Sequence, residues 1–390
     1  MDSPYGPADA REQTRLLTQR IKGRGTALGF DLVGVSPMEA PAHSESFADW
    51  LRRGYHGEME YLSRTGEKRM HPGAFLPWAR SVVSVAVNYN TPYDRRVERQ
   101  GMRGWISRYA WGEDYHDVMQ AKLMRLLDYV REEAGPEVQG QVFVDAGPVL
   151  DRDAGARAGI GWYGKNTNLL SVQIGSFFFL GELFLSLPLE WDRPIRDRCG
   201  QCRLCLDACP TNAFVGPYVL DARKCISYLT IELKGAIPRE LRPLMGAHIF
   251  GCDICQDVCP YNTKVKATRE PAFHPRQGRH APDLIPLLSL TEAEFKATFA
   301  GSPILRAKRR GFLRNVCVAL GNLKRSEAVP ALIATLEKDP DPLVRGHAAW
   351  ALGQMPARDA EEALSEARVR ETDAMVLEEI QAAIDAVGRD

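Results

Sequence analysis

The sequence predicts an α+β protein built from three consecutive parts, and three observations support this division. Helical and strand-like hydrophobic patterns alternate over residues 1–190, which predicts an N-terminal α/β part. Eight of the nine cysteines lie within residues 191–275. After a proline-rich connection, residues 289–390 carry helical patterns alone. A chain of 390 residues has room for two to three domains, so we expect the three parts to be domains.

Within the N-terminal part, hydrophobic periodicity predicts strands over residues 82–89 and 142–145 and an amphipathic helix near residues 117–133. The most apolar stretch is residues 174–189. It is interrupted by Glu182 and is shorter than the roughly 20 residues that a membrane span needs. We therefore expect a buried pair of strands there and no contact with a membrane.

Composition and charge restrict the class of protein only broadly. Apolar residues make up 45% of the chain and charged residues 26%, which is ordinary for a folded globular protein. The formal net charge is zero, so net charge indicates neither a nucleic-acid nor a membrane partner. The N-terminus lacks a basic segment followed by an apolar core, so we expect a cytoplasmic protein. In that compartment cysteines are more often ligands or catalysts than disulfides.

The C-terminal part shows internal similarity. The tripeptide Ala-Leu-Gly recurs at 319–321 and 351–353, late in two helix-like stretches that a proline-marked turn separates. This pattern resembles HEAT-type repeats, although its period is shorter than the roughly 40–47 residues of that class. We predict two to three helical units, with a plain helical bundle as the alternative.

The cysteines follow a bacterial ferredoxin pattern. Cys199 opens the run C-x2-C-x2-C-x3-C-P, in which the fourth cysteine binds the other of two [4Fe–4S] clusters. A second run, C-x2-C-x3-C-P from Cys252, lacks its leading cysteine, which Cys225 can supply. The predicted ligands of one cluster are Cys199, Cys202, Cys205 and Cys259. Those of the other are Cys209, Cys225, Cys252 and Cys255.

Cys317 is then left over, and its apolar helical surroundings predict a buried thiol. Zinc is the alternative occupant, because it also binds C-x2-C pairs in tetrahedral thiolate sites. Two zinc sites would not require the ferredoxin run or its repetition. The spacing therefore favours iron–sulfur clusters and a chain that moves electrons.

Several longer phrases carry a resemblance to a known family. They are SRYAWGEDYH (107–116), VDAGPVLDR (144–152), GWYGKNTNLL (161–170), CISYLTIE (225–232) and FGCDICQDVCPYN (250–262). Together they resemble the epoxyqueuosine reductases of queuosine biosynthesis, over residues from about 25 to 360. The resemblance implies a cobalamin-binding catalytic domain over 1–190, similar to cobalamin-processing proteins and reductive dehalogenases. It also implies a ferredoxin-like domain over 191–275 and a tRNA-binding HEAT-like domain over 289–390.

The resemblance further implies a reaction. The family reduces the epoxide of epoxyqueuosine to the cyclopentene of queuosine, at the wobble position of tRNAs with a GUN anticodon. It uses cobalamin supplied with electrons through two [4Fe–4S] clusters, consumes two electrons and two protons, and releases water. We expect an external one-electron donor and a monomeric enzyme.

Asp145 matches the proton donor of the family. It ends the apolar phrase QVFVD, and a positioned acid that protonates an opening epoxide typically contributes about 10²–10⁴-fold. Apolar surroundings would raise the pKa of Asp145 and keep it protonated. The alternative is that Asp145 caps the following turn or helix.

The corrin contacts are also implied by the resemblance. The loop 161–168 offers polar side chains, and its glycines allow close backbone approach. The predicted cofactor-binding residues are Arg69, Ala110, Asp145, Lys165, Asn166, Asn168, Leu180, Ser227 and Asp253. Arg69 has the alternative of a surface charge, and Ala110 that of simple packing. Asp114-Tyr115-His116 begins like the cobalamin signature Asp-x-His-x-x-Gly, but Met119 replaces the glycine, so we interpret it as coincidence.

A cationic segment supports a tRNA partner. Residues 301–326 contain seven Lys or Arg and no Asp or Glu, which is the charge pattern expected of phosphate binding. The predicted substrate-binding residues are Lys234, Arg239, Arg309 and Arg310. The alternative is a solvated helix face.

Two other functions remain open at this stage. One is a dehalogenase-like, cobalamin-dependent reductase of a small organic substrate, which would need neither the cationic segment nor the repeats. The other is an electron-transfer or scaffolding iron–sulfur protein, which would bind no cobalamin.

Overall fold

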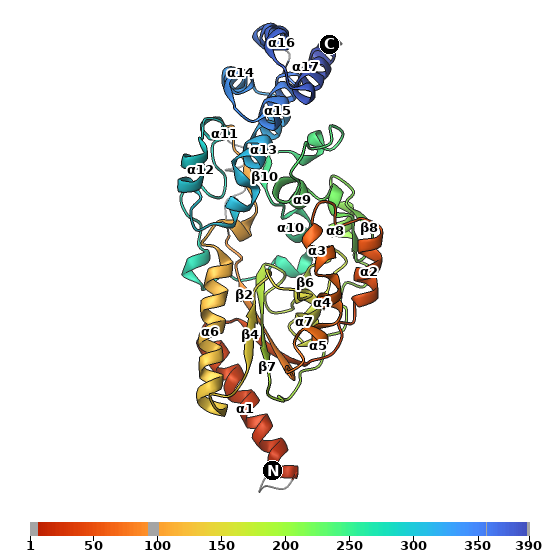
Figure 1. Cartoon of the computed structure of the whole chain (residues 1–390), viewed down its shortest axis with the longest axis vertical. Coiled ribbons are helices and arrows are strands. Elements are labelled where there is room, and N and C mark those ends of the chain that lie inside the picture. Colours follow the sequence, from red (N-terminus) through yellow and green to blue (C-terminus); the bar gives the residue numbers. More distant parts are fainter. Residues whose placement is uncertain (1–6, 93–100, 356, 388–390) are drawn as a thin grey trace.

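The computed structural model describes residues 7–92, 101–355 and 357–387. The molecule is elongated, with the N-terminal helix at one end of its long axis and the last helices at the other (Figure 1). None of the helices in these three ranges is long and apolar enough to cross a membrane.

A four-stranded antiparallel sheet organises the N-terminal part, in the order β1-β2-β7-β4. Its strands are β1 (Leu32–Pro37), β2 (Ser81–Asn88), β4 (Gly140–Phe143) and β7 (Phe178–Leu185). Every residue of β2 is buried, because helices cover both faces of the sheet. This two-sided burial explains why the sequence of β2 is a continuous apolar run and not an alternating one.

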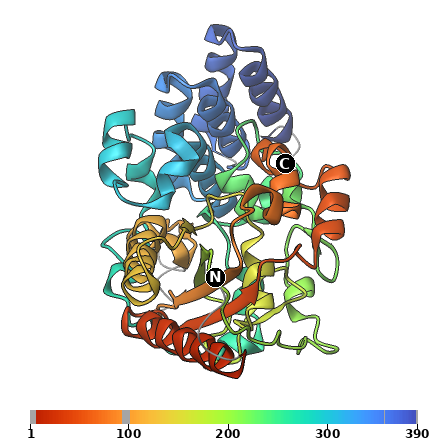
Figure 2. The ribbon, with the colours of Figure 1, turned by 60° about the horizontal axis from the view of Figure 1, so that its bottom comes forward.

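Helices α1 (Pro7–Ala27) and α6 (Tyr115–Ala134) lie together on one face of the sheet (Figure 2). Helix α7 (Asp151–Arg157) covers the other face. The remaining helices of this part are short: α2 (Ser44–Arg52), α3 (Glu60–Arg64), α4 (Gly66–Met70) and α5 (Pro72–Phe75). The predictions of a strand over 82–89 and a helix near 117–133 are confirmed within one or two residues.

Two strand predictions need correction. The stretch 174–189 contains one strand, β7, and not a pair, because residues 178–185 pair continuously with β2 on one side and residues 182–185 pair with β4 on the other. Strand β4 ends at Phe143, two residues earlier than expected. The reason is Asp145, whose φ of 54° lies in the left-handed region and turns the chain away from the sheet.

The cysteine-rich part consists of loops and short elements. They are α8 (Leu204–Asp207), β8 (Phe214–Gly216), β9 (Val219–Leu220), α9 (Ile226–Ile231), β10 (His248–Phe250) and α10 (Ile254–Asp257). Helices α8 and α10, one from each cysteine run, pack against each other. Strand β10 pairs in parallel with β3 (Trp105–Ile106) of the N-terminal part, so the two parts share a small sheet. A second hairpin joins β5 (Trp162–Tyr163) to β6 (Leu169–Leu170).

The C-terminal part forms two layers of helices. Short helices α11 (Leu284–Leu287) and α12 (Glu292–Thr298) lead into it. One layer stacks α13 (Lys308–Leu323), α15 (Pro342–Leu352) and α17 (Ala374–Val387). The other contains α14 (Val329–Lys338) and α16 (Arg358–Arg370). This layered stacking is the arrangement of helical repeats and not that of a plain bundle.

The recurring Ala-Leu-Gly now has a physical explanation. A Cβ on Gly321 of α13 would lie 3.0 Å from the Cα of Ala351 in α15. A Cβ on Gly353, just after α15, would lie 2.8 Å from the Cα of Ala383 in α17. Each glycine therefore lets the next stacked helix approach closely. Cys317 lies in the same layer and is fully buried, as predicted.

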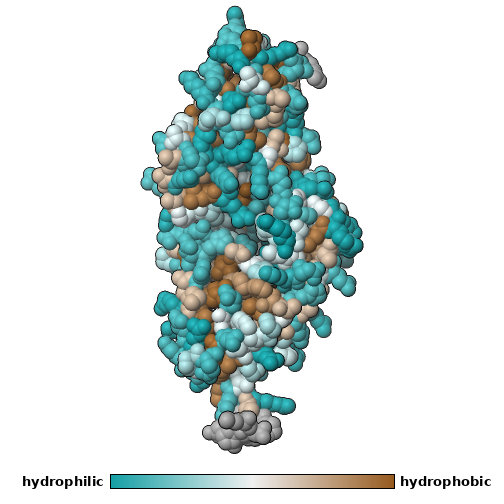
Figure 3. Space-filling model, viewed as in Figure 1, coloured by the Kyte–Doolittle hydropathy of each residue, from teal (hydrophilic) through white to brown (hydrophobic). Residues whose placement is uncertain are grey.

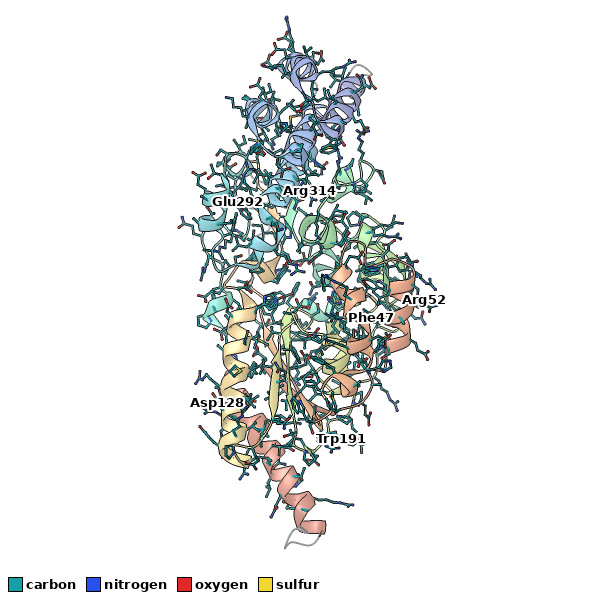
Figure 4. The ribbon with its side chains drawn as sticks, viewed as in Figure 1. Phe47, Arg52, Asp128, Trp191, Glu292 and Arg314 are labelled. Carbon is teal, nitrogen blue, oxygen red and sulfur yellow. The ribbon has the colours of Figure 1, made fainter. Side chains whose placement is uncertain are left out.

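A buried joint connects the repeats to the cysteine-rich part. Arg314 of α13 is fully buried at this junction (Figure 4) and donates to the backbone carbonyls of Leu229, Leu233 and Gly235. The neighbouring Asn315 donates to the carbonyls of Thr230 and Ile249. The repeats, α9 and β10 thus share one hydrophobic core.

Candidate functional site

Asp145 lies on the loop after β4, at the end of the sheet that faces the cysteine-rich part. The same end carries Asn88 of β2, whose side chain donates to the carbonyl of Lys266. The hydroxyl of Tyr115 donates to the Asp145 carboxylate. Asp145 is exposed, so the expected enclosure by apolar groups is wrong. The capping alternative also fails, because helix α7 begins only at Asp151 and its N-cap is Leu150, with no side-chain cap.

Arg69 braces the loop that carries Asp145. Its guanidinium donates to the carbonyl of Val149 and to Thr65, and the residue is 6% exposed. The alternative of a plain surface charge is therefore excluded. Arg69 fixes the far end of the loop 144–150, and this contact positions Asp145 indirectly.

Two acids, the buried Glu182 and the half-buried Asp151, lie behind Asp145. Glu182, in the middle of β7, is fully buried, and neither of its carboxyl oxygens has a hydrogen-bond partner among the described residues. Burial and then the Asp151 carboxyl raise the pKa of Glu182 well above its usual value. Burial and then the charge of Asp145 raise the pKa of Asp151 to about 6. Two ionised carboxylates cannot hydrogen bond to each other, so the pair is satisfied only when it holds a proton.

Aromatic rings lie next to Asp145 on the side away from Asp151 and Glu182. The ring of Tyr115 stacks on Phe179 at 4.2 Å and on His116 at 4.1 Å. Burial and the charge of Asp145 raise the pKa of Tyr115, so its hydroxyl remains a donor. Asp114 accepts bonds from the backbone N–H and the ring of His116 and caps α6.

The loop 161–168 faces the cysteine-rich part. Lys165 donates to the carbonyls of Gly200 and Cys202, and Asn166 donates to that of Cys255. The amide of Asn168 lies 3.9 Å from the Cys255 sulfur. The three predicted corrin-binding residues thus fasten this loop to the cysteine loops.

The glycines of this loop serve the β5–β6 hairpin. A Cβ on Gly161 would lie 2.1 Å from the carbonyl oxygen of Leu170, and one on Gly164 would lie 2.3 Å from the Leu170 side chain. The space beside them is therefore filled by the hairpin itself. Their predicted use, close approach to a corrin ring, is replaced by a packing requirement.

The other predicted cofactor residues differ in accessibility. Ala110 is fully buried, and Asp253 is 1% exposed and accepts bonds from the Ser107 hydroxyl and the Arg108 N–H. Leu180 and Ser227 are half-buried and present some surface. Figure 3 shows hydrophobic surface gathered just below the middle of this face, over the end of the sheet nearest the cysteine-rich part.

The cysteines gather in the two predicted sets. A cavity of about 60 Å³ is lined by Cys199, Cys202, Cys205 and Cys259. Burial, followed by the neighbouring thiols of that set, raises the pKa of Cys205 to about 11. In the second set, burial is likewise the largest cause of the raised pKa of Cys255, and the Cys225 thiol is the second largest. Metal binding must displace the protons of these thiols.

The geometry fits clusters better than single metal ions. In a tetrahedral zinc site with Zn–S bonds of about 2.3 Å, the sulfurs lie roughly 3.8 Å apart. Among the described residues, no group of three or more His, Cys, Asp or Glu side chains could hold a single metal ion. Four cysteines around a cavity suit a cubane, which holds its thiolates further apart. The two sets differ in exposure: Cys202 of the first set is exposed although Cys259 is buried, whereas no cysteine of the second set is exposed and burial raises the pKa of the Cys252 and Cys255 thiols well above its usual value.

Acids from elsewhere in the chain neutralise part of the cationic segment 301–326. Arg309 pairs with Asp339 at 2.5 Å and Arg310 pairs with Asp341 at 3.0 Å. Arg239 pairs with Glu379 at 3.1 Å. The segment itself contains no acid, but the expectation that its cations are uncompensated is wrong, because the fold brings acids from other segments against them. Within the described part of the chain, Lys308, Lys324, Arg325 and Lys234 are exposed, and none of them has a recorded ion pair.

Sequence reasoning missed three residues of this site. Tyr115, Asp151 and Glu182 surround or back Asp145, but they come from α6, α7 and β7. A signal existed for Glu182, because a lone acid interrupts the most apolar stretch of the chain. No local signal marks Tyr115, since its contact depends on how α6 packs against the sheet.

Comparison with protein-family models gives three matches. A 4Fe-4S double cluster binding domain matches residues 198–262, and HEAT repeats match residues 303–385. A model described as "Epoxyqueuosine reductase QueG, DUF1730" matches residues 69–146. The predictions of two [4Fe–4S] clusters and of HEAT-type repeats are thereby confirmed, and zinc is not supported.

Curated relatives are similar over most of the chain. The epoxyqueuosine reductase of Pseudomonas aeruginosa is 44% identical over 86% of this chain and 94% of its own length. That of Escherichia coli K12 is 42% identical over 88% of this chain and 90% of its own length.

Solved structures show the same similarity. An epoxyqueuosine reductase with an epoxyqueuosine-modified tRNA-Tyr stem loop has a TM-score of 0.88 and 34% identity, over 96% of this chain and 99% of that one. The Bacillus subtilis epoxyqueuosine reductase, with its catalytic aspartate loop swung out of the active site, has a TM-score of 0.88 and 33% identity, over 95% and 99%.

These relatives leave both alternative functions, a small-substrate reductase and an electron-transfer or scaffolding protein, without support. The chain carries a double [4Fe–4S] cluster binding domain and a repeat domain joined to a mixed helix and strand part. It therefore belongs to the epoxyqueuosine reductase family, a family of oxidoreductases that convert epoxyqueuosine to queuosine.

Proposed function

We propose that this chain performs its family's reaction on tRNA, with Asp145 as the proton donor and cobalamin as the redox cofactor at the end of the sheet. The observation that carries this proposal is the position of Asp145. It is exposed, held by Tyr115, and placed at the end of the sheet that faces the cysteine-rich part. Residues 1–190, 191–275 and 289–390 would then bind cobalamin, clusters and tRNA, respectively.

Cobalamin would lie between the sheet and the cysteine-rich part. When bound, it supplies the low-potential electrons that break the epoxide C–O bonds. Leu180, Ser227 and Asn168 have accessible surface there and would contact it. Half-buried apolar groups beside amide and hydroxyl groups suit a large ring that carries amide side chains. Lys165, Asn166, Ala110 and Asp253 would act from behind, by holding the wall of this site in place.

The chain's own contribution to the chemistry is proton supply and positioning. The reaction needs two protons for the oxygen that leaves as water, and Asp145 would deliver one to the epoxide oxygen. Tyr115 orients the Asp145 carboxyl, and Arg69 fixes the loop that carries it. In the Bacillus subtilis relative the catalytic aspartate loop is found swung out of the active site. We propose that the Asp145 loop also moves, to admit the wobble nucleotide.

The tRNA would contact the repeats and the edge of the site. A relative of this chain has been solved with an epoxyqueuosine-modified tRNA stem loop. Lys308, Lys324, Arg325 and Lys234 are exposed cations without a recorded ion pair, so they are available to phosphates. Arg309, Arg310 and Arg239 remain in the proposal, but each would have to exchange an acidic partner for a phosphate.

Anaerobic reconstitution tests the proposal. We expect the purified chain with eight irons and bound cobalamin to convert epoxyqueuosine in tRNA from a strain that lacks the enzyme into queuosine, measured by mass spectrometry of nucleosides. Absence of conversion by protein that contains both clusters and cobalamin would overturn it. We propose that the enzyme is monomeric and cytoplasmic and takes its electrons from an external one-electron donor.

A further inference from the structure

The cluster set of Cys199, Cys202, Cys205 and Cys259, called the outer set below, reaches the surface formed by the described residues. Cys202 is exposed, and the cavity formed by its set is also lined by Leu204 and Arg198. The tip of the β8–β9 hairpin lies against the same loop, since the Tyr218 hydroxyl donates to Asp197 and the Tyr218 N–H donates to the carbonyl of Lys165. The hairpin therefore borders the side of the outer set on which Cys202 is exposed.

This border is unusually apolar for an exposed surface. Leu204 is 51% exposed, Val215 48%, Tyr218 42% and Val219 37%. These four are among ten exposed large hydrophobic side chains in the described ranges, and they lie on α8 and on the β8–β9 hairpin, which Lys165 connects to the loop of Cys202. Exposed apolar groups that cluster in this way mark an interaction site more often than isolated ones do.

The charges beside this apolar surface have one predominant sign. Arg196 and Arg198 precede the first cysteine run, and Lys264 and Lys266 follow the second. All four are exposed, and no ion pair is recorded for any of them within the described ranges. The two segments lie side by side, because the Tyr261 hydroxyl donates to the carbonyl of Arg198. Of the exposed acids nearby, Asp207 pairs with Arg203, whereas Asp197 accepts from the neutral Tyr218 hydroxyl and keeps its charge, so the four cations still outnumber the unpaired acid.

We propose that this surface, formed by Leu204, Val215, Tyr218, Val219, Arg196, Arg198, Lys264 and Lys266, docks an acidic one-electron carrier protein that reduces the outer cluster. The inference deepens the proposed function, because it assigns the entry point of the electrons which that function consumes. The apolar centre and cationic border of this surface suit a small, transient interface, which is the kind that electron-transfer partners usually form. An acidic partner follows from charge complementarity, which mainly raises the association rate.

Electrons would then move from the exposed outer cluster to the more buried inner cluster. The carrier gives one electron at a time to the outer cluster, which passes it to the inner cluster, held by Cys252 and Cys255 deeper in the protein. The carrier is oxidised by one electron in each encounter, and two encounters supply one turnover. The inner set is fastened to the N-terminal part by Asn166, which donates to the carbonyl of Cys255.

Stopped-flow reduction of the reconstituted holoenzyme separates docking from catalysis. Reduced flavodoxin and a reduced acidic [2Fe–2S] ferredoxin serve as protein donors, dithionite serves as the small-molecule donor, and cluster bleaching is the signal. We expect the double variant Arg196→Glu/Lys264→Glu to be reduced by both carriers at least about 10-fold more slowly at low ionic strength. The deficit should shrink as salt is added. Reduction by dithionite should be unchanged.

A matched control carries the same change of net charge far from this surface. Arg11→Glu/Arg125→Glu lies on α1 and α6, which Figure 1 shows on the other side of the molecule from α8 and β8 and closer to its N-terminal end. It should be reduced by the carriers at the unmodified rate. Val215→Asp should slow the carriers and leave dithionite unaffected, because it adds an acid to the apolar centre.

Equal carrier rates in the docking variant and the control would overturn the proposal. So would a loss of tRNA affinity in Arg196→Glu/Lys264→Glu without a change in carrier rates, since these cations would then bind phosphates. If the rate of reduction by dithionite also falls in the Glu variant, the neutral double variant Arg196→Gln/Lys264→Gln distinguishes lost docking from a damaged cluster site. It should keep full iron content and still be slowed with the carriers, and an unslowed neutral pair contradicts docking. Dithionite-driven queuosine formation tests the proposed function separately, because it needs no carrier.

Discussion

Two regions of this molecule bury charged side chains, and they treat them in opposite ways. At the joint between the repeats and the cysteine-rich part, Arg314 is fully buried and every arm of its guanidinium has an acceptor. In the sheet, Glu182 is equally buried, but its oxygens have no donor among the described residues. The first arrangement is that of a rigid connection. The second suits a site that must hold a proton.

The largest effect is expected at the exposed neighbour of Glu182 and Asp151. Asp145→Ala should lower turnover by about 10²–10⁴-fold, because the proton for the epoxide oxygen is lost. Stability should hardly change, since Asp145 is exposed and the change also removes the carboxyl charge beside Asp151. Single-turnover assays with full clusters and cobalamin measure this, and Asp145→Glu serves as the control. Unchanged turnover in the alanine variant would remove Asp145 from the mechanism.

The joint should show the next largest effect. Arg314→Ala leaves the carbonyls of Leu229, Leu233 and Gly235 buried without donors, which costs about 3–5 kcal/mol in the free energy of unfolding. Arg314→Lys should retain part of the stability that the alanine variant loses. Urea denaturation of both variants gives the comparison. A cost below about 1 kcal/mol for the alanine variant would show that the joint is not tightly packed in solution.

The buried acid should make stability depend on pH. The folded-state pKa of Glu182 is raised above its unfolded value, so its contribution is fully present below that unfolded value and is lost as pH rises towards the folded pKa. Glu182→Gln cannot titrate. We expect the variant to lose less stability than the unmodified protein as pH rises above the ordinary glutamate pKa of about 4.3. Parallel pH profiles in urea denaturation would contradict a protonated Glu182.

The smallest effects are expected among the surface cations. Lys324→Glu/Arg325→Glu should weaken tRNA binding several-fold at low salt and reduce the salt dependence by about two phosphate contacts. Arg309→Glu breaks the pair with Asp339, so it should mainly lower stability. Filter-binding titrations at several salt concentrations separate the two. If Arg309→Glu weakens tRNA binding more strongly than the Lys324 and Arg325 variant, the paired cation is the true phosphate contact.

What could be predicted from the sequence depended on how local the determining interactions are. The cysteine sets followed from spacing, because two-residue steps on tight loops restrict which thiolates can share a cluster. The repeats followed from Gly321 and Gly353, whose close contacts recur once per unit. The helix over α6 and the strand β2 followed from their hydrophobic patterns.

Other features depend on contacts between distant segments. Arg309 and Arg310 seemed uncompensated because Asp339 and Asp341 lie beyond the segment, at the turn that leads into α15. Asp145 was expected in apolar surroundings because the strand before it is apolar, but its left-handed backbone turns it outward. The partners of loop 161–168 could not be predicted, since they belong to cysteine loops that fold against it from elsewhere in the chain.

The parallel pairing of β3 with β10 has a consequence for synthesis of the protein. Trp105 and His248 are neighbours in this small sheet but are far apart along the chain. At roughly 5–20 residues per second, β10 leaves the ribosome about 7–30 seconds after β3. During that interval the strand edge of β3 and the apolar residues beside it lack their partners. A ribosome-bound chain stopped between the two strands should therefore be recognised by chaperones, and one extended past β10 should be released from them.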